Sequence, residues 1–315
     1  MTTTTPPLLV TPEPEMSSRK LKVQMRAADA KTKLSSPWAS GLAVVIAIMW
    51  TVPTVGLLAN SVRNGTGANT GPSTSAWWTF FTNGVHFSFA NYSHAWTGNN
   101  GNTAPMSSFL LNTVAITLPA VFIPITLALL AAYAFAWIDF KGKNILFIAV
   151  FAMQIVPIQV ALIPMNTIYV KFGLNTSFWS IWLSHTIFGL PLAIFLLHNF
   201  MKEIPASLVE AARVDGAGHV KIFLQVLLPL LVPAIASFGI FQFLWVWNDL
   251  LVALTFSSSN TSPITKGIQG LTTQFASAAD VLPAAAIIAM LVPLGVFVSL
   301  QRFFVRGLLA GSVKG

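Results

Sequence analysis

Long runs of apolar residues alternate with short polar segments along most of the chain. Uncharged stretches cover residues 34–62, 64–138, 144–170, 172–201, 222–248 and 281–301. A helix needs about 20 apolar residues to cross the roughly 30 Å hydrocarbon layer of a bilayer. The pattern therefore predicts an all-α membrane protein with six transmembrane helices. These helices are expected at about residues 38–58, 106–137, 145–169, 178–198, 224–256 and 282–303.

The basic residues are divided unevenly between the two sides of these helices. The side with both termini and the loops at 138–143 and 199–229 carries 14 Lys and Arg, and the other side carries three. Lys and Arg are enriched in cytoplasmic loops. Both termini are therefore predicted to be cytoplasmic.

This topology divides the chain into three parts. A cytoplasmic N-terminal tail (1–37) is either partly disordered or an interfacial helix, and a second cytoplasmic tail covers 305–315. The transmembrane domain lies between them, at 38–304. Residues 60–105, which are rich in Asn, Gly, Thr, Ser and aromatic residues, form an extracytoplasmic loop within it. Aromatic side chains of this loop are expected at the membrane interface, which favours amphipathic rings.

The composition supports the membrane assignment. Only 8% of the residues are charged, against about 25% in soluble domains, which excludes a soluble enzyme and a disordered chain. The net charge of +8 would suit a nucleic-acid partner, but the topology accounts for it, so none is predicted. The chain has no Cys, which excludes thiol chemistry and a Cys-based metal site. The first 33 residues have no apolar core, so a cleaved signal peptide is not expected.

Proline and uncharged polar residues interrupt the predicted spans. Each proline removes a backbone donor, and the freed carbonyl must be satisfied by a neighbour or by water. These prolines either produce ordinary kinks or mark hinges beside a solute path. The polar residues either bond between helices or face such a path; they are Gln154, Gln159, Asn166 and Gln242.

Several catalytic motifs are missing from the sequence. It contains no phosphate-binding G-x-x-x-x-G-K-[ST] loop, no H-E-x-x-H and no G-x-S-x-G, so neither a catalytic residue nor a metal or cofactor site is predicted. The five His are scattered along the chain. Asp249 is the one serious intramembrane candidate for proton coupling, and it is expected near the outer interface. An autonomous ion-coupled pump is therefore disfavoured.

The loop at 199–229 combines helix and turn signals. Pro205 suits the first turn of a helix over Ala206–Val214, whose Leu208, Ala211 and Ala212 are expected on one side. Gly216 allows a positive φ in the turn that follows, and Asp215 is expected to cap the next helix. The loop is thus predicted to be a cytoplasmic docking surface for another protein.

The same loop resembles the EAA loop of permease subunits of ABC importers. The matching residues are Glu210, Ala211, Ala212, Gly216, Leu228 and Pro229, with Val226 where that family favours Ile. The Trp245–Asp249 segment and the 301–315 tail are also similar. The likeness covers residues 106–315 and is closest to the MalG-like permease of maltose and α-glucoside systems, which implies the inner membrane of a prokaryote.

This resemblance implies that the chain works in a complex with other subunits, each with its own role. A second permease subunit completes the path, two ATPase subunits bind ATP beneath it, and an extracytoplasmic binding protein delivers the sugar. The present chain would then be neither an enzyme nor a cofactor-binding protein. Glu210 would be the polar anchor in the ATPase, Ala211 and Ala212 the close-packed surface, and Gly216 the turn. The 311–315 tail would reach between the ATPases, and the 257–281 loop would contact the binding protein.

Two questions stay open at this point. Trp245, Trp247, Asn248 and Asp249 either line the outer mouth of the path or form an interfacial aromatic belt with a helix-end network. The alternative functions are an ABC permease for a non-sugar solute, such as glycerol phosphate or a polyamine, and an autonomous carrier or intramembrane enzyme.

Overall fold

The computed structural model describes residues 37–63, 77–79, 87–98, 104–273 and 281–310, and side chains of the last range only to Gln301. The expectations for the N-terminal tail, much of the 60–105 loop and the 311–315 tail fall outside these residues. The chain divides into two units, Met1–Gly56 and Leu57–Gly315. Helix α2 (Pro37–Ser61) crosses this boundary, and the packing described below belongs to the second unit.

Every named element of the described part is helical, as predicted. Five segments are long and apolar enough to cross a membrane, and a bent helix pair makes a sixth if it counts as one span. The five are α2, α5 (Met106–Trp137), α8 (Phe178–Glu203), the continuous segment His219–Trp247 that ends with α11 (Leu228–Trp247), and α15 (Val281–Ala310).

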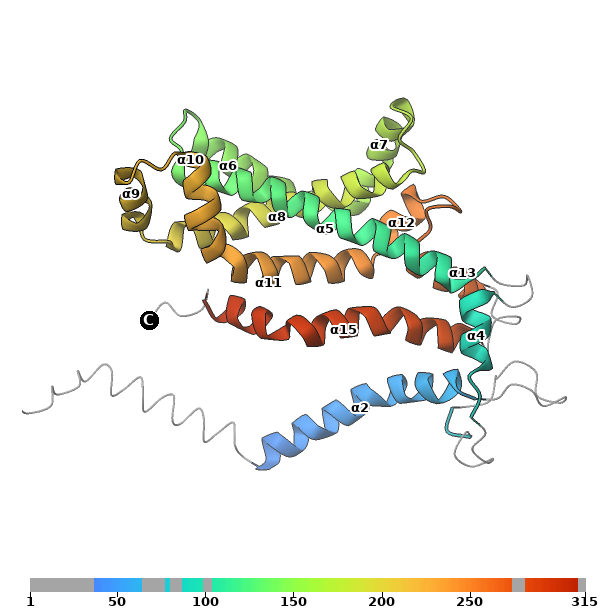
Figure 1. The fold of residues 1–315 in the computed structure, drawn as a ribbon. Helices are drawn as coiled ribbons and strands as arrows, with labels where there is room; N and C mark the ends of the chain where they lie inside the picture. The colour runs from blue at the N-terminus through green and yellow to red at the C-terminus, as the bar shows by residue number, and fades with distance from the viewer. Residues whose placement is uncertain (1–36, 64–76, 80–86, 99–103, 274–280, 311–315) are drawn as a thin grey trace, which may run out of the picture. The chain divides into compact units, whose positions relative to one another are not determined.

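The bent pair differs from the continuous third span that was predicted. It consists of α6 (Lys143–Ala152) with the 3₁₀ turn η1 (Met153–Ile155), followed by α7 (Ile158–Lys171), and it bends by 102°. Pro157 lacks an N–H and forces the preceding residue out of the helical region, and Val156 accordingly has an extended backbone. Figure 1 shows α6 beside α10 at one end of the bundle and α7 near α12 at the other, so the two helices together extend from one end of the bundle to the other.

The fifth span also differs from its prediction. It begins at His219 with α10 (His219–Lys221) and a π-helical segment, η2 (Ile222–Leu227), and it ends at Trp247. The expected helix at 224–256 therefore stops early. Its last part is the separate short helix α12 (Leu251–Phe256).

Two of the polar loops contain short helices of their own. Helix α4 (Ala90–Thr97) lies in the 60–105 loop, and α13 (Ile264–Thr273) lies in the 257–281 loop. Helix α13 packs against α5 and α15. Gly267 permits this approach, because a Cβ there would lie 2.7 Å from the Phe109 ring.

Helix α5 is at the centre of the bundle, with α8 and α11 packed against it and α15 against α11. Small residues let these helices approach closely, as in other membrane proteins. Ala128 and Ala132 of α5 and Ala193 of α8 have no exposed surface. The core formed around them extends to the loop that carries Val209.

Three prolines in this bundle have their freed carbonyls occupied by side chains of other helices. Pro119 and Pro124 of α5 leave the carbonyls of Ala115 and Ala120 without their helical donors, and Pro293 of α15 does the same for Ala289. The donors are Trp182 Nε1 (3.0 Å), Gln242 Nε2 (3.1 Å) and Trp247 Nε1 (3.1 Å), respectively. These proline-carbonyl bonds fasten α5 to α8 and to α11, and α11 to α15.

The bond to Gln242 provides a stability test. Gln242 is 1% exposed and lies against Gly189, where a Cβ would be 2.8 Å from the amide. The Gln242→Leu substitution leaves the Ala120 carbonyl without this donor, so we expect a loss of about 1–3 kcal/mol in unfolding free energy. The thermal unfolding midpoint in detergent measures the loss. Gln159→Leu, the same change at an exposed site of α7, is the control, and equal shifts for the two variants would contradict the assignment.

Candidate functional site

The loop between α8 and α11 is a compact two-helix projection. Helix α9 (Ala206–Val214) follows Pro205, as predicted, and a tight turn leads to α10. Gly216 has a φ of 77°, which confirms the positive φ expected of it. Its N–H bonds to Arg213 O (3.0 Å), and the N–H of Ala217 bonds to Ala212 O (2.9 Å). This pair of bonds is the Schellman motif, which ends a helix with its last carbonyls satisfied.

Asp215 has a different place from the one predicted. It is the C-cap residue of α9, whereas the N-cap of α10 is Gly218, with no side-chain capping bond. The reason is that the Schellman turn continues for two more residues before α10 begins. Asp215 therefore presents an exposed carboxylate at the tip of the loop.

The two faces of α9 are unlike each other. Val209 is 2% exposed and belongs to the bundle core, and Ala212 packs partly against that core. Glu210 and Ala211 are exposed, and Val214 is 88% exposed. Leu208, Ala211 and Ala212 share one side of the α9 helix, as their spacing predicts. The most deeply buried side chain is that of Val209, on the neighbouring side. The outer face thus offers a carboxylate beside small and apolar side chains.

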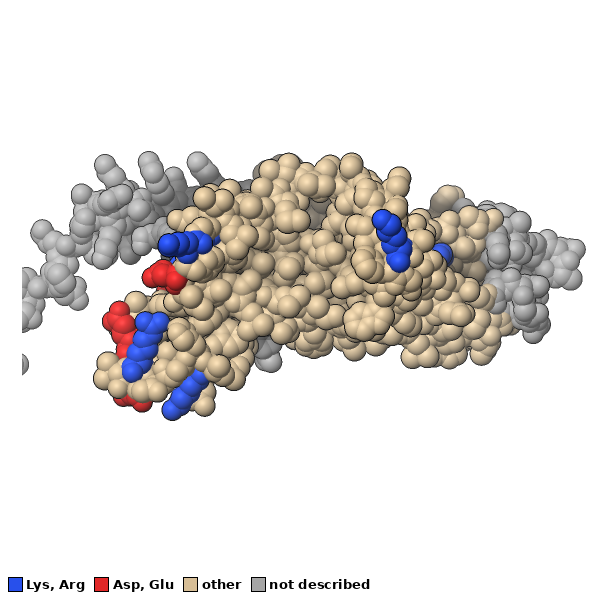
Figure 2. Space-filling view, turned by 90° about the horizontal axis from the view of Figure 1, so that it is seen from above, with Lys and Arg blue, Asp and Glu red and all other residues tan. Residues whose placement is uncertain are grey.

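Charged side chains gather at the end of the described molecule that carries α9. Figure 2 shows them in red and blue there, with a wide uncharged region beyond it. Leu228 and Pro229 follow the loop, at the start of α11. Leu228 packs against the core and Pro229 is exposed, so these two residues join the loop to the bundle rather than extend its outer face.

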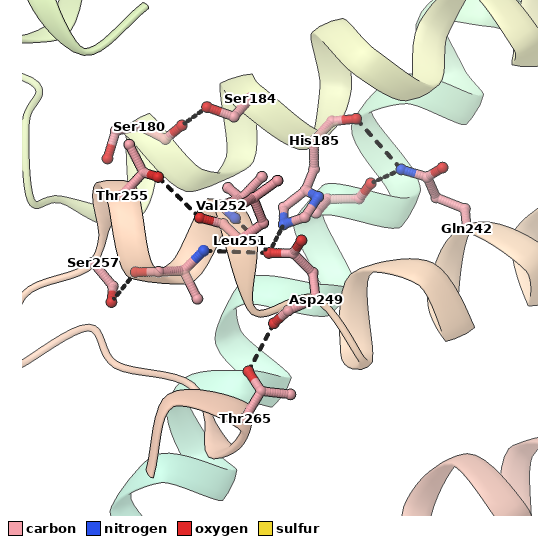
Figure 3. Close-up of polar contacts among 12 residues, drawn as sticks. Ser180, Ser184, His185, Gln242, Asp249, Leu251, Val252, Thr255, Ser257 and Thr265 are labelled. Atoms are coloured by element: carbon pink, nitrogen blue, oxygen red, sulfur yellow. Dashed lines mark hydrogen bonds and ion pairs between the residues drawn. The ribbon is translucent and has the colours of Figure 1, made fainter. Parts of the chain in front are cut away.

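A second polar cluster lies at the opposite end of α11 (Figure 3). Asp249 Oδ2 accepts hydrogen bonds from the backbone N–H groups of Val252 (3.0 Å) and Ala253 (3.2 Å), so it satisfies the first turn of α12. His185 Nε2 lies 3.9 Å from the same oxygen, and its side chain is 2% exposed. The Trp245 ring contacts the His185 ring edge-on at 5.2 Å. The carboxylate therefore caps the first turn of α12 and lies beside His185 of α8.

The four candidate residues of the outer mouth, within 245–249, point in different directions. Trp245 and Asp249 meet at His185, whereas Trp247 is 2% exposed and bonds to Ala289 of α15. Asn248 is exposed, and its amide donates to Leu244 O at 2.7 Å. A helix-end network is thus present around Asp249. Whether these residues line the outer mouth stays a prediction.

A hollow of about 470 Å³ lies where the bent pair α6–α7 faces α8. All its lining residues are uncharged, and most are apolar. Gln154 and Gln159 supply its amide groups, and Gln154 Nε2 donates to Phe188 O at 3.0 Å. Of the uncharged polar residues left open above, Gln154 and Gln242 bond between helices, Gln159 lines this hollow, and Asn166 is half-buried.

Comparison with known families decides the assignment. Residues 124–309, which include both the α9 loop and the cluster at Asp249, match the family described as binding-protein-dependent transport system inner membrane component. The chain belongs to this family. It is therefore a multi-pass permease of the inner membrane and a component of an ABC importer, as the resemblance of its α9 loop indicated.

Individual relatives agree with this assignment. The permease is 46% identical to the osmoprotective compounds uptake permease protein GgtD of Synechocystis sp., over 86% of this chain and 90% of that one. It is 45% identical to the alpha-glucoside transport system permease protein AglG of Rhizobium meliloti, over 68% of this chain and 58% of that one.

A solved structure shows the shared fold. It is a bacterial ABC transporter involved in the import of the acidic polysaccharide alginate, and it superposes on the permease with a TM-score of 0.67 at 18% identity. The match covers 93% of this chain and 100% of that chain.

Sequence reasoning missed two residues that organise these sites. His185 had been set aside with the other scattered histidines, yet it contacts both Asp249 and Trp245. Trp182 had no assigned role, and it donates to the carbonyl freed by Pro119. For Trp182 the sequence contains a signal, because the residue four before a helical proline has a free carbonyl and the N–H of an indole in a transmembrane helix needs an acceptor.

Proposed function

We propose that the permease forms half of the translocation path for a neutral oligosaccharide of the α-glucoside type. A second permease forms the other half, and a separate pair of ATPase subunits binds and hydrolyses ATP. An extracytoplasmic binding protein delivers the sugar. The single observation that carries the proposal is the α9 loop, which presents an exposed carboxylate and apolar side chains at the end of the bundle where charged side chains gather.

The outer face of α9 suits a protein partner. Ala211 allows close approach, Val214 contributes apolar area, and Glu210 contributes a charge that a basic group can meet. Buried interface charges give orientation as well as affinity. The Schellman turn at Gly216 keeps α9 short and sets its angle to α10, so α9 and α10 move together. We infer that α9 seats in the ATPase and that ATP-driven closure moves the bundle through it.

The chemistry of the path favours an uncharged, hydroxyl-rich solute. The hollow between α6–α7 and α8 has amide groups and apolar surface but no charged lining, so an anionic or polycationic solute has no counter-charge there. Amides donate to and accept from sugar hydroxyls. The similarity to the alpha-glucoside permease AglG supports the sugar class. The similarity to GgtD favours osmoprotective compounds as the second candidate.

Transport by the reconstituted importer tests this proposal. The permease is purified from its own membranes with its associated subunits, placed in vesicles, and supplied with the binding protein. We expect ATP-dependent uptake of labelled maltose or another α-glucoside, and competition by unlabelled neutral disaccharide. Uptake without the ATPase subunits would contradict the importer assembly. Competition by glycerol phosphate or a polyamine, with none by sugars, would contradict the solute class.

A further inference from the structure

A polar contact between distant parts of the chain joins the α9 loop to the transmembrane bundle. The Tyr133 hydroxyl lies 2.6 Å from His219 Nδ1 and shares a hydrogen bond with it, and the imidazole tautomer decides which atom donates. The two residues are 86 positions apart in the sequence. Tyr133 is near the end of α5 and 8% exposed, whereas His219 is the first residue of α10 and exposed. The bond therefore connects the loop to the central helix of the bundle.

The remaining attachment of this loop to the bundle, among the described residues, is mainly apolar. Val209 and Ile222 are buried in the bundle core, and Ala212 and Ala217 pack partly against it. Apolar contacts are non-directional, so they allow one surface to slide over another. The hydrogen bond between Tyr133 and His219 has a preferred distance and angle, and it fixes the loop at one point on α5.

The chain beyond His219 departs from regular α-helical geometry. Residues Ile222–Leu227 form a π-helical segment between α10 and α11. Such segments are rare, hold their backbone less regularly than an α-helix, and occur frequently at functional sites. A force that reached α11 only along the chain would pass through this segment. The contact with α5 provides a route that bypasses it.

Tyr133 also holds the π-helical segment itself. Its ring packs edge-on against the His219 ring (centroids 6.0 Å apart) and against the Phe223 ring (5.4 Å). His219 precedes the segment and Phe223 lies inside it. One side chain of α5 therefore touches the residues on both sides of the junction between α10 and η2.

We propose that Tyr133 and His219 form a coupling joint that transmits movement of the α9 loop to α5. This inference rests on the proposed docking of the ATPase at α9. Tyr133 and His219 act as positioning residues: they contact neither solute nor nucleotide, and they set the angle between the loop and the bundle. Loss of the joint should leave the ATPase bound but make its cycle less effective in moving the solute path.

The test measures solute transported per ATP hydrolysed. Tyr133→Phe removes the hydroxyl and keeps the ring contacts, so the fold is preserved. In vesicles with the ATPase subunits and the binding protein, we expect normal co-purification of the ATPase and a roughly three- to tenfold fall in solute per ATP, the range of one net hydrogen bond. Tyr169→Phe is the matched control, because its hydroxyl bonds to Ser184 (3.1 Å) elsewhere in the bundle.

Substitutions at His219 provide the second arm. His219→Asn keeps a polar group near the position of Nδ1 and should retain most of the coupling, whereas His219→Leu should lose it. Combining Tyr133→Phe with His219→Leu should be no worse than either alone, because both remove the same bond. An unchanged ratio in Tyr133→Phe, or additive losses in the double variant, would overturn the coupling joint.

The outcome separates this inference from the proposed function. If Glu210→Lys abolishes assembly and transport while Tyr133→Phe leaves the ratio unchanged, the docking proposal stands and the joint fails. If Glu210→Lys changes neither assembly nor transport, the proposed docking at α9 is wrong. The coupling joint, which depends on that docking, is then wrong as well.

Discussion

Glu210→Lys is expected to abolish uptake and to release the ATPase subunits from the permease. Glu210 is exposed on the outer face of α9, beside Ala211, where the docked partner would meet it. Removing one member of a buried interface charge pair costs about 2–5 kcal/mol in binding, and reversing its sign adds repulsion. Membrane insertion should be unchanged, because the side chain lies outside the core. Co-purification of the ATPase and uptake into vesicles measure the two effects.

A nearby acid provides the control for this experiment. Glu203 is the last residue of α8, is exposed, and precedes α9. Glu203→Lys changes the net charge at the same end of the molecule by the same amount. We expect it to retain assembly and most transport. Equal losses in both variants would show that the surface charge as a whole matters, rather than a docked carboxylate at Glu210.

Gly216→Val should produce the second large loss. Gly216 has a φ of 77°, and a left-handed residue other than glycine costs about 1–2 kcal/mol, with β-branched residues the least tolerated. The Schellman turn should open, so that α9 no longer keeps its angle to α10. We expect uptake to fall about tenfold or more, with faster amide hydrogen exchange over residues 212–219. Exchange and uptake together separate a loosened loop from a globally unfolded chain.

Gly218→Val isolates the backbone effect. At both glycines an added Cβ meets no atom within 4 Å, so the two sites have the same open space around the Cβ. Gly218 has a φ of −74° and an extended ψ of 171°, which valine adopts readily. The control variant should therefore transport almost normally. A comparable loss at Gly218 would mean that the loop is sensitive to side-chain bulk and not to the turn.

The pattern of apolar residues predicts most of the long helices of the bundle. Helix α5 has the bounds that were expected, 106–137, because an uninterrupted apolar run in lipid must satisfy its backbone internally. The broken third span could have been predicted from the same rules, since Pro157 places Val156 in an extended conformation. The predicted fifth span is too long because the chain is apolar again from Leu250, directly after Asn248 and Asp249. Asp249 nevertheless starts a new helix there.

In the candidate sites, the sequence predicts only the features that depend on neighbouring residues. The end of α9 followed from Gly216, and the docking segment followed from its resemblance to a known loop. The direction of Val209 depended on the register of a nine-residue helix, which a short pattern specifies poorly. The contact between Tyr133 and His219 joins distant segments, and η2 has no compositional signature. Neither can be read from residue order without the packing.

The proline-carbonyl bonds have a consequence for the ways in which this sequence can change over time. Pro124 and the amide of Gln242 form one functional unit, because the proline creates the acceptor that the amide satisfies. A lineage that loses the amide first carries an unsatisfied carbonyl in the membrane, whereas one that loses the proline first restores the helical N–H and makes the amide dispensable. The order of substitution therefore matters, and relatives that lack one member of the pair should tend to lack the other. Trp182 and Trp247 are subject to the same epistasis with Pro119 and Pro293.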